Sequence, residues 1–178
     1  MKIKTLSSRE IYKNKWMTLR EDEIERPSGS KGIYSVVDKP DFAIIVPIEG
    51  EYIHLVEQYR YPVEGRYWEL PQGTWDDVDD VDPRELAHGE LREETGLVAK
   101  SLEYVGHLLL APGLSSQGYH IFLATDMIRE ESMLDKEEED LITKKFTIEE
   151  FEEMIKNGVI KDASTICAFS FVKLKGLL

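Results

Sequence analysis

The sequence contains a single cysteine, Cys167, among its 178 residues. One cysteine cannot form an internal disulfide, and this favours an intracellular protein. No run of about 20 apolar residues occurs, as a membrane-spanning helix would require, and residues 1–13 lack the apolar core of a signal peptide. We therefore expect a cytoplasmic protein that has no membrane partner.

Basic residues are also scarce. The chain has 22 lysines and arginines against 35 aspartates and glutamates, which gives a net charge of −13. A general binder of nucleic-acid backbones needs a basic surface, so we expect no nucleic-acid partner. If the substrate is an anion, the protein must neutralise it with a metal ion or gather its few cations locally.

The length suits one well-packed domain and is small for two. Residues 1–40 alternate apolar and polar side chains in short bursts, with a turn signal at 27–30. This pattern predicts a meander of antiparallel strands, which is too small to hold a core alone. We expect it to pack on the main domain, 41–178, or on a partner subunit.

Strands and helices are interspersed in the rest of the chain, which predicts a mixed α/β (α+β) layered sandwich. Helices are expected to begin after Asp82, at Thr147 with Glu150 completing a capping box, and at Asp162. The last helix should turn four apolar side chains toward the core: Ile166, Phe169, Val172 and Leu174. The expected strands are 42–48, 52–59, 102–110, 119–126 and 144–146.

Three carboxylates gather within five residues of the first expected helix. Glu90, Glu93 and Glu94 are spaced so that Glu90 shares a helical face with each of the others. Like charges so placed repel unless a cation lies between them, and Mg²⁺ prefers carboxylate oxygens together with a substrate phosphate. Gly96 supplies the helix stop. The alternative is a solvated acidic face followed by a C-cap.

The stretch 69–97 resembles the Nudix box, G-x5-E-x7-R-E-U-x-E-E-x-G-U, in which U is aliphatic. Two positions differ: Gly89 stands where the motif has arginine, and Val81 or Asp82 falls where it has the first glutamate. The loop after Gly73 also carries two extra residues. In the motif, that arginine and that glutamate usually form a bracing salt bridge, and this chain lacks both residues. The metal-binding carboxylates are kept.

Segments outside the box resemble the ADP-ribose pyrophosphatase branch of this family. They are 57–62, 68–71, 112–116, 15–17 and 32–34. The resemblance implies a Nudix-like α/β/α sandwich and Mg²⁺-dependent (or Mn²⁺-dependent) hydrolysis of a nucleoside diphosphate sugar to a nucleoside monophosphate and a sugar phosphate. It also implies a homodimer, in which the N-terminal piece crosses to the other subunit and helps to form each base site.

The same resemblance assigns roles to residues near the metal. Glu90 and Glu94 would be metal ligands, Glu93 a third ligand or a carboxylate that orients water, and the main-chain carbonyl of Gln72 would complete the site. The general base would come from the acidic loop 130–140, where Glu139 is the first choice and Glu138 the second.

Roles in substrate binding follow from the resemblance as well. Arg60 would bind phosphate, with a surface ion pair as its alternative. Trp16 and Tyr34 would stack the base; the alternative role for these two residues is packing within the strands. Glu69 would bind a substrate amine or the dimer mate. The loop that contains Gly113 and Leu114 would also contact substrate.

Two other functions stay open at this point. The substrate could be GDP-mannose or another nucleotide sugar, or the chain could be a non-catalytic Nudix-fold module that binds a nucleotide. The four histidines show no metal-ligand spacing and are expected to be structural. Cys167 is expected to pack among apolar neighbours.

Overall fold

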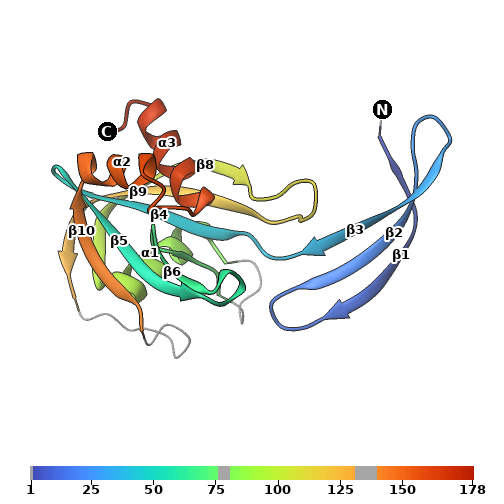
Figure 1. Cartoon of the computed structure of the whole chain (residues 1–178), viewed down its shortest axis with the longest axis horizontal. Helices are drawn as coiled ribbons and strands as arrows, with labels where there is room; N and C mark the ends of the chain where they lie inside the picture. Colours follow the sequence, from blue (N-terminus) through green and yellow to red (C-terminus); the bar gives the residue numbers. More distant parts are fainter. Residues whose placement is uncertain (1, 76–80, 131–139) are drawn as a thin grey trace. The chain divides into compact units, whose positions relative to one another are not determined.

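The computed structural model describes residues 2–75, 81–130 and 140–178 (Figure 1). Contacts within the chain divide it into two compact units. The first comprises 1–41 and 108–119, and the second comprises 42–107 and 120–178. None of the described helices is long and apolar enough to span a membrane.

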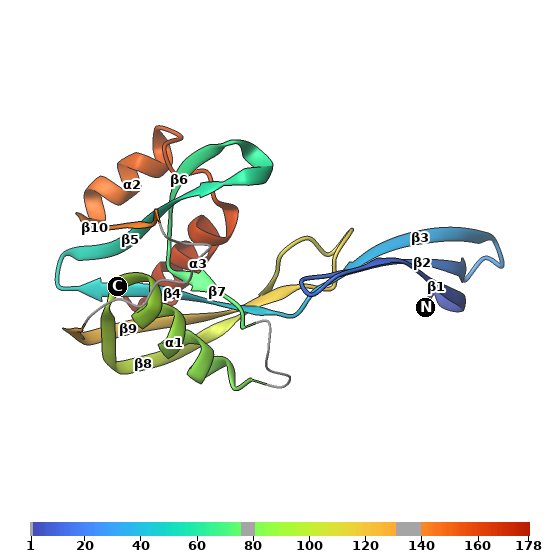
Figure 2. The same cartoon turned by 90° about the horizontal axis from the view of Figure 1, so that it is seen from below.

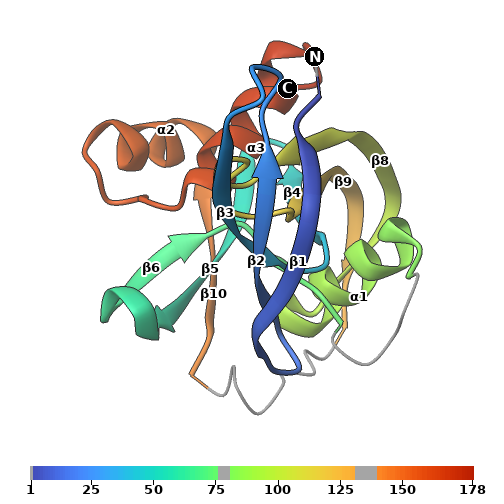
Figure 3. The ribbon, with the colours of Figure 1, turned by 90° about the vertical axis from the view of Figure 1, so that its right-hand side faces the viewer.

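The first unit is built on a three-stranded antiparallel sheet. Its strands are β1 (Lys4–Lys13), β2 (Thr18–Glu25) and β3 (Lys31–Asp38), which lie side by side in Figure 3. Gly29 makes the β2–β3 turn with a φ of 83°, a conformation that glycine adopts without steric cost. Every residue of β1 is exposed. The predicted antiparallel meander is thus confirmed.

The 108–119 segment joins this unit through main-chain hydrogen bonds. Val37 N donates to Leu114 O at 2.9 Å, and Ser116 N donates to Val37 O at 3.1 Å. The Ser115 hydroxyl also donates to Val37 O, at 2.9 Å. The loop is therefore fixed along the end of β3.

The second unit contains a sheet in the order β10-β5-β4-β9-β8, with β6 beside β5 and β7 beside β4. The strands are β4 (Phe42–Glu49), β5 (Tyr52–Arg60), β6 (Gly65–Glu69), β7 (Gln72–Gly73), β8 (Leu97–Leu109), β9 (Gly118–Arg129) and β10 (Ile142–Thr147). The first six residues of β4 are buried, as expected for a strand covered on both faces.

Helices lie on both faces of this sheet: α1 (Pro83–Thr95) on one, α2 (Ile148–Lys156) and α3 (Ala163–Leu174) on the other (Figures 1 and 2). Ala43 and Ile45 of β4 share a core cluster with Leu86 and Leu91 of α1. Behind the sheet, Phe151 of α2 packs edge-on against Phe169 of α3, with ring centroids 4.6 Å apart. The predicted α/β/α sandwich is confirmed.

The helices begin where the sequence predicts. Asp82 caps α1 by accepting from Arg84 N, Thr147 and Glu150 form the capping box of α2, and Asp162 caps α3. Two expectations for α3 are wrong: Leu174 is 85% exposed, and Cys167 is exposed rather than packed. Leu174 is the last residue of the helix, and Cys167 lies on a side of α3 that faces solvent.

Candidate active site

Helix α1 turns Glu90 and Glu94 toward the sheet. The two side chains are one turn apart and almost fully buried, with 6% and 1% of their surface exposed. Glu93, on a neighbouring face, is half-buried. The helix ends at Gly96, whose φ of 67° provides the left-handed stop and whose N–H donates to Arg92 O. The sequence pattern therefore places two of the three box carboxylates inside the molecule.

The backbone of β7 lies directly on these two carboxylates. Gln72 N donates to Glu94 Oε2 at 3.0 Å. A Cβ atom added at Gly73 would lie 2.4 Å from Glu90 Oε2, so only glycine leaves room for that carboxylate. Pairing with Ala43 and Ile44 of β4 holds the β7 backbone in place.

This donor set fits a divalent cation. Two buried carboxylates offer hard oxygen ligands, and the absence of a side chain at Gly73 lets the Glu90 carboxylate lie against the β7 backbone. In the described ranges, the three box glutamates do not bring three ligand oxygens within 4.8 Å of one another. The fit therefore rests on Glu90 and Glu94, and the roles expected for Glu93 and for the Gln72 carbonyl stay predictions.

Arg60 and Glu69 form a forked ion pair beside these carboxylates. Arg60 Nε donates to Glu69 Oε1 at 3.0 Å and Nη2 donates to Oε2 at 2.5 Å, while Glu69 is 3% exposed. Burial lowers the pKa of Arg60, but the hydrogen bond and charge of Glu69, with the charges of Glu94 and Asp162, outweigh it and raise the pKa. Arg60 is thus held as a cation.

The structure adds Asp162, a residue that the sequence marks only as a helix start. The side-chain amide of Gln72 donates to Glu69 Oε2 at 3.0 Å and to Asp162 Oδ2 at 3.2 Å. Asp162 also accepts from Thr165 N at 2.7 Å. The start of α3, residues 69–72 and α1 are therefore joined in one polar network, in which acidic groups outnumber Arg60 and a bound cation would be stabilised.

In the first unit, three of the residues expected to bind substrate lie close together. The Tyr34 hydroxyl donates to Gly113 O at 3.1 Å, and Leu114 is bonded to the same strand through Val37. Trp16 is 45% exposed, with Lys15 Nζ 4.4 Å from its ring centroid. It lines a pocket of about 270 Å³ formed by 13–18 and 38–40. Tyr34 is 39% exposed, and the base-stacking role of both aromatic residues stays a prediction.

The first and second choices for the general base, Glu139 and Glu138, lie outside the described residues. Their role stays a prediction.

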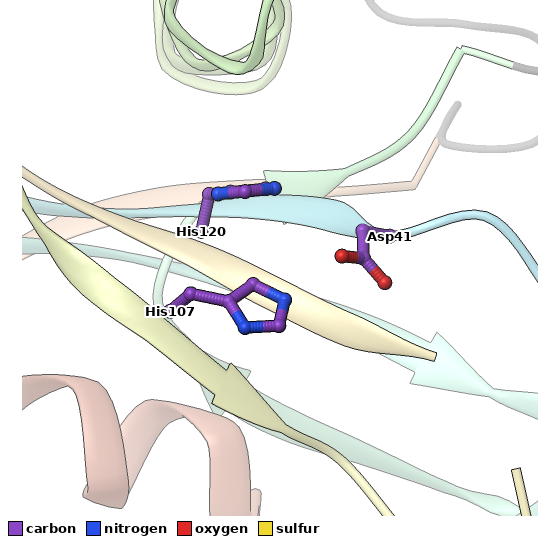
Figure 4. A group of neighbouring side chains, drawn as sticks. All are labelled: Asp41, His107 and His120. Atoms are coloured by element: carbon purple, nitrogen blue, oxygen red, sulfur yellow. The ribbon is translucent and has the colours of Figure 1, made fainter. Parts of the chain in front are cut away.

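Two histidines that were expected to be structural lie next to each other on neighbouring strands of the second unit. His107 of β8 and His120 of β9 have ring centroids 4.8 Å apart (Figure 4). Their spacing of 13 residues gives no local signal, because only the β8–β9 pairing brings them together. His54, which is buried, is bonded to Glu49 through Nε2 at 3.2 Å.

Comparison with known proteins identifies both parts of the chain. Residues 39–169 match the NUDIX domain, and residues 3–37 match the nucleoside diphosphate sugar hydrolase N-terminal domain. A methanol dehydrogenase activator from Bacillus methanolicus is 28% identical over 177 residues, which cover 98% of this chain and 95% of that protein. An ADP-ribose pyrophosphatase from Bacillus subtilis is 29% identical over 179 residues, with the same coverage.

The fold is similar to that of a solved relative. A crystal structure of an ADP compounds hydrolase matches with a TM-score of 0.87 at 24% identity, covering 99% of this chain and 96% of that one. The expected enzyme class, a hydrolase of nucleoside diphosphate compounds, is confirmed by the family models together with these relatives. Because the NUDIX model spans most of the sequence, the chain belongs to the NUDIX family.

Proposed function

We propose that this chain is a cytoplasmic Mg²⁺-dependent pyrophosphatase of ADP-ribose or a closely related nucleoside diphosphate sugar, with Mn²⁺ as a possible substitute. The buried pair Glu90 and Glu94 under the β7 backbone is the observation that supports it most directly. The name of the Bacillus subtilis relative supports the choice of ADP-ribose.

The reaction adds one water across the P–O–P bridge and yields a nucleoside monophosphate and a sugar phosphate. A bound divalent cation would neutralise phosphate oxygens and lower the pKa of the attacking water. Arg60 would bind a phosphate oxygen through those guanidinium N–H groups that are not hydrogen-bonded to Glu69. Glu93 or Glu139 would accept the proton of the water.

Recognition of the nucleotide would fall to the first unit. The exposed rings of Trp16 and Tyr34 offer flat faces on which a base can stack. Gly113 and Leu114 would contact the substrate from the neighbouring loop, and Glu69 would accept a hydrogen bond from a substrate amine. A base could replace Lys15, which lies over the Trp16 ring.

We further propose that the active form is a homodimer. All ten residues of β1 are exposed, and apolar side chains of this sheet, among them Ile11 and Ile33, face solvent at 46% and 61%. A small sheet with an uncovered apolar surface is an expected partner for a second copy. In this family branch, such a contact would help to form each base site.

Replacing Glu94 by glutamine tests the proposed chemistry. Glu94→Gln keeps the shape of the side chain but removes one negative charge from the metal site. We expect hydrolysis of ADP-ribose in the presence of Mg²⁺ to fall by at least about 100-fold, because metal-assisted catalysis supplies several kcal/mol. The exposed Glu85, in the first turn of the same helix, supplies the control, and Glu85→Gln should keep its activity.

The same assay separates the alternatives. Robust release of GMP from GDP-mannose without any hydrolysis of ADP-ribose would replace our substrate choice. A wild-type protein that hydrolyses none of a panel of nucleotide sugars, yet binds one of them, would instead favour the non-catalytic module.

A further inference from the structure

The loop that follows β7 is joined to α1 by an apolar contact. Trp75 lies two residues after Gly73, and its indole rests on the helix backbone at Gly89. A Cβ atom added at Gly89 would lie 2.1 Å from Cζ2 of Trp75, and 3.0 and 3.1 Å from two further ring atoms. Real Cβ atoms do not come so close to another heavy atom, so the ring can occupy this position only because residue 89 is a glycine.

Trp75 has further apolar contacts. It packs against the core cluster that contains Leu86 and Leu91 of α1, and Val81 packs against the same cluster. Gly89 stands where the box has arginine, and Val81 is one of the two residues, with Asp82, that fall where the box has its first glutamate. Both Val81 and the indole at Gly89 thus take part in apolar packing.

This contact bears on the candidate metal site because of where it lies. Gly89 directly precedes Glu90 in α1, and Trp75 directly follows Gly73 and Thr74. Gly73 in turn lies against Glu90, and Gln72 N donates to Glu94. The loop is thus attached to the helix at two neighbouring places, one polar at the carboxylates and one apolar at Gly89.

We propose that Trp75 is a positioning residue that, by packing on Gly89, holds the backbone of 72–73 against the carboxylates of Glu90 and Glu94 in the geometry that binds the metal. This inference rests on the metal site of the proposed function. Groups that orient metal ligands without touching the ion typically change metal affinity by about 10- to 100-fold when they are removed.

The test is to add a methyl group at Gly89 and to measure metal binding directly. Alanine is favoured over glycine inside a helix by about 1 kcal/mol, so Gly89→Ala would stabilise the helix if Trp75 were not in the way. We expect the dissociation constant for Mn²⁺, measured from the free-ion electron paramagnetic resonance signal, to rise by about tenfold. The KM for nucleotide sugar should change far less than kcat.

A double variant shows whether the effect passes through the indole. Trp75→Ala should weaken Mn²⁺ binding to a similar extent, and adding Gly89→Ala to it should weaken binding no further, because the clash partner is gone. Trp75→Phe keeps an aromatic ring and should retain most of the affinity.

A matched control exists elsewhere in the same unit. A Cβ atom added at Gly106 of β8 would lie 2.6 Å from a ring carbon of Phe171 in α3, and both residues lie outside the box. Gly106→Ala should therefore lower the free energy of unfolding while leaving the Mn²⁺ affinity unchanged.

The measurements on these variants distinguish a failure of this inference from a failure of the proposed function. If Gly89→Ala binds Mn²⁺ as the wild type does, or if its effect adds to that of Trp75→Ala, the inference is wrong and the proposed metal site stands. If the wild type itself binds no Mn²⁺ through Glu94, as judged with Glu94→Gln, both the inference and the proposed function are wrong.

Discussion

At the scale of single residues, the contacts of Arg60 change what its sequence position implies. A surface ion pair was the alternative to phosphate binding, and the structure shows an ion pair whose carboxylate partner, Glu69, is buried. Because a guanidinium has five N–H donors, a fork with one carboxylate does not exhaust them. The pair therefore orients Arg60 and leaves it N–H groups that Glu69 does not use, so that phosphate binding stays a prediction.

His54 makes the stability of the protein depend on pH. Burial lowers its pKa below the ordinary value of 6.5, and the hydrogen bond with Glu49 only partly opposes this. Below pH 6.5 the unfolded chain takes up a proton at His54, whereas the folded protein takes it up only at a lower pH. The contribution of His54 to the free energy of unfolding is therefore complete above pH 6.5. It is lost as the pH falls from there toward the folded-state pKa.

We expect the urea midpoint of the wild type to fall between pH 7 and pH 5, and that of His54→Gln to fall less. Glu49 does not confuse this comparison, because Lys145 and His54 lower its pKa below 4.5, outside the range tested. An equal fall in both proteins would show that His54 is not the group responsible.

At the scale of elements, α2 depends on its first turn. Thr147 accepts from Glu150 N at 3.1 Å, and Glu150 Oε2 accepts from Thr147 N at 2.8 Å, which completes a capping box. We expect Thr147→Ala to lower the free energy of unfolding by about 1 kcal/mol, measured with urea. Thr147→Ser keeps the hydroxyl and should lose much less; equal losses in the two variants would contradict the capping role.

The elements that the sequence predicts best are those with a local signal. Asp82 followed by proline, the capping box at Thr147, and Asp162 mark the three helix starts. The short strands β6 and β7 have no such signal, because β7 is only two residues long and is defined by its pairing with β4. The strand β8 begins at Leu97, earlier than the expected 102, because nothing in the sequence separates it from the helix stop at Gly96.

The candidate site also combines contacts that a local sequence signal predicts with contacts that no local signal predicts. Helical periodicity predicts that Glu90 and Glu94 share a face. No periodicity predicts that Asp162 meets Gln72 or that Trp75 covers Gly89, because these contacts join elements far apart in the sequence or depend on the course of a loop. The departure at Gly89 is visible in the sequence, but its reason appears only once the ring is placed beside it.

At the scale of the whole molecule, the proposed dimer is open to direct measurement. Sedimentation equilibrium at micromolar concentration should give twice the 20.5 kDa of one chain. Ile11→Glu places a charge on the exposed face of β1 and should shift the mass toward the monomer, because burying an unpaired charge in an interface is costly.

Val159→Glu supplies the control for this measurement. Val159 is 48% exposed, close to the 46% of Ile11, and lies outside the β1–β3 sheet. A monomeric wild type, or an equal shift with both variants, would count against a dimer formed through this sheet.

The exposed thiol of Cys167 on α3 has a practical consequence for such work. As the sole cysteine of the chain, it offers one defined attachment point for a maleimide dye or a nitroxide spin label. In air, two molecules could also become covalently crosslinked through it. Preparations without a reductant would then contain a species of doubled mass that owes nothing to the N-terminal strands, and a serine at this position removes that ambiguity.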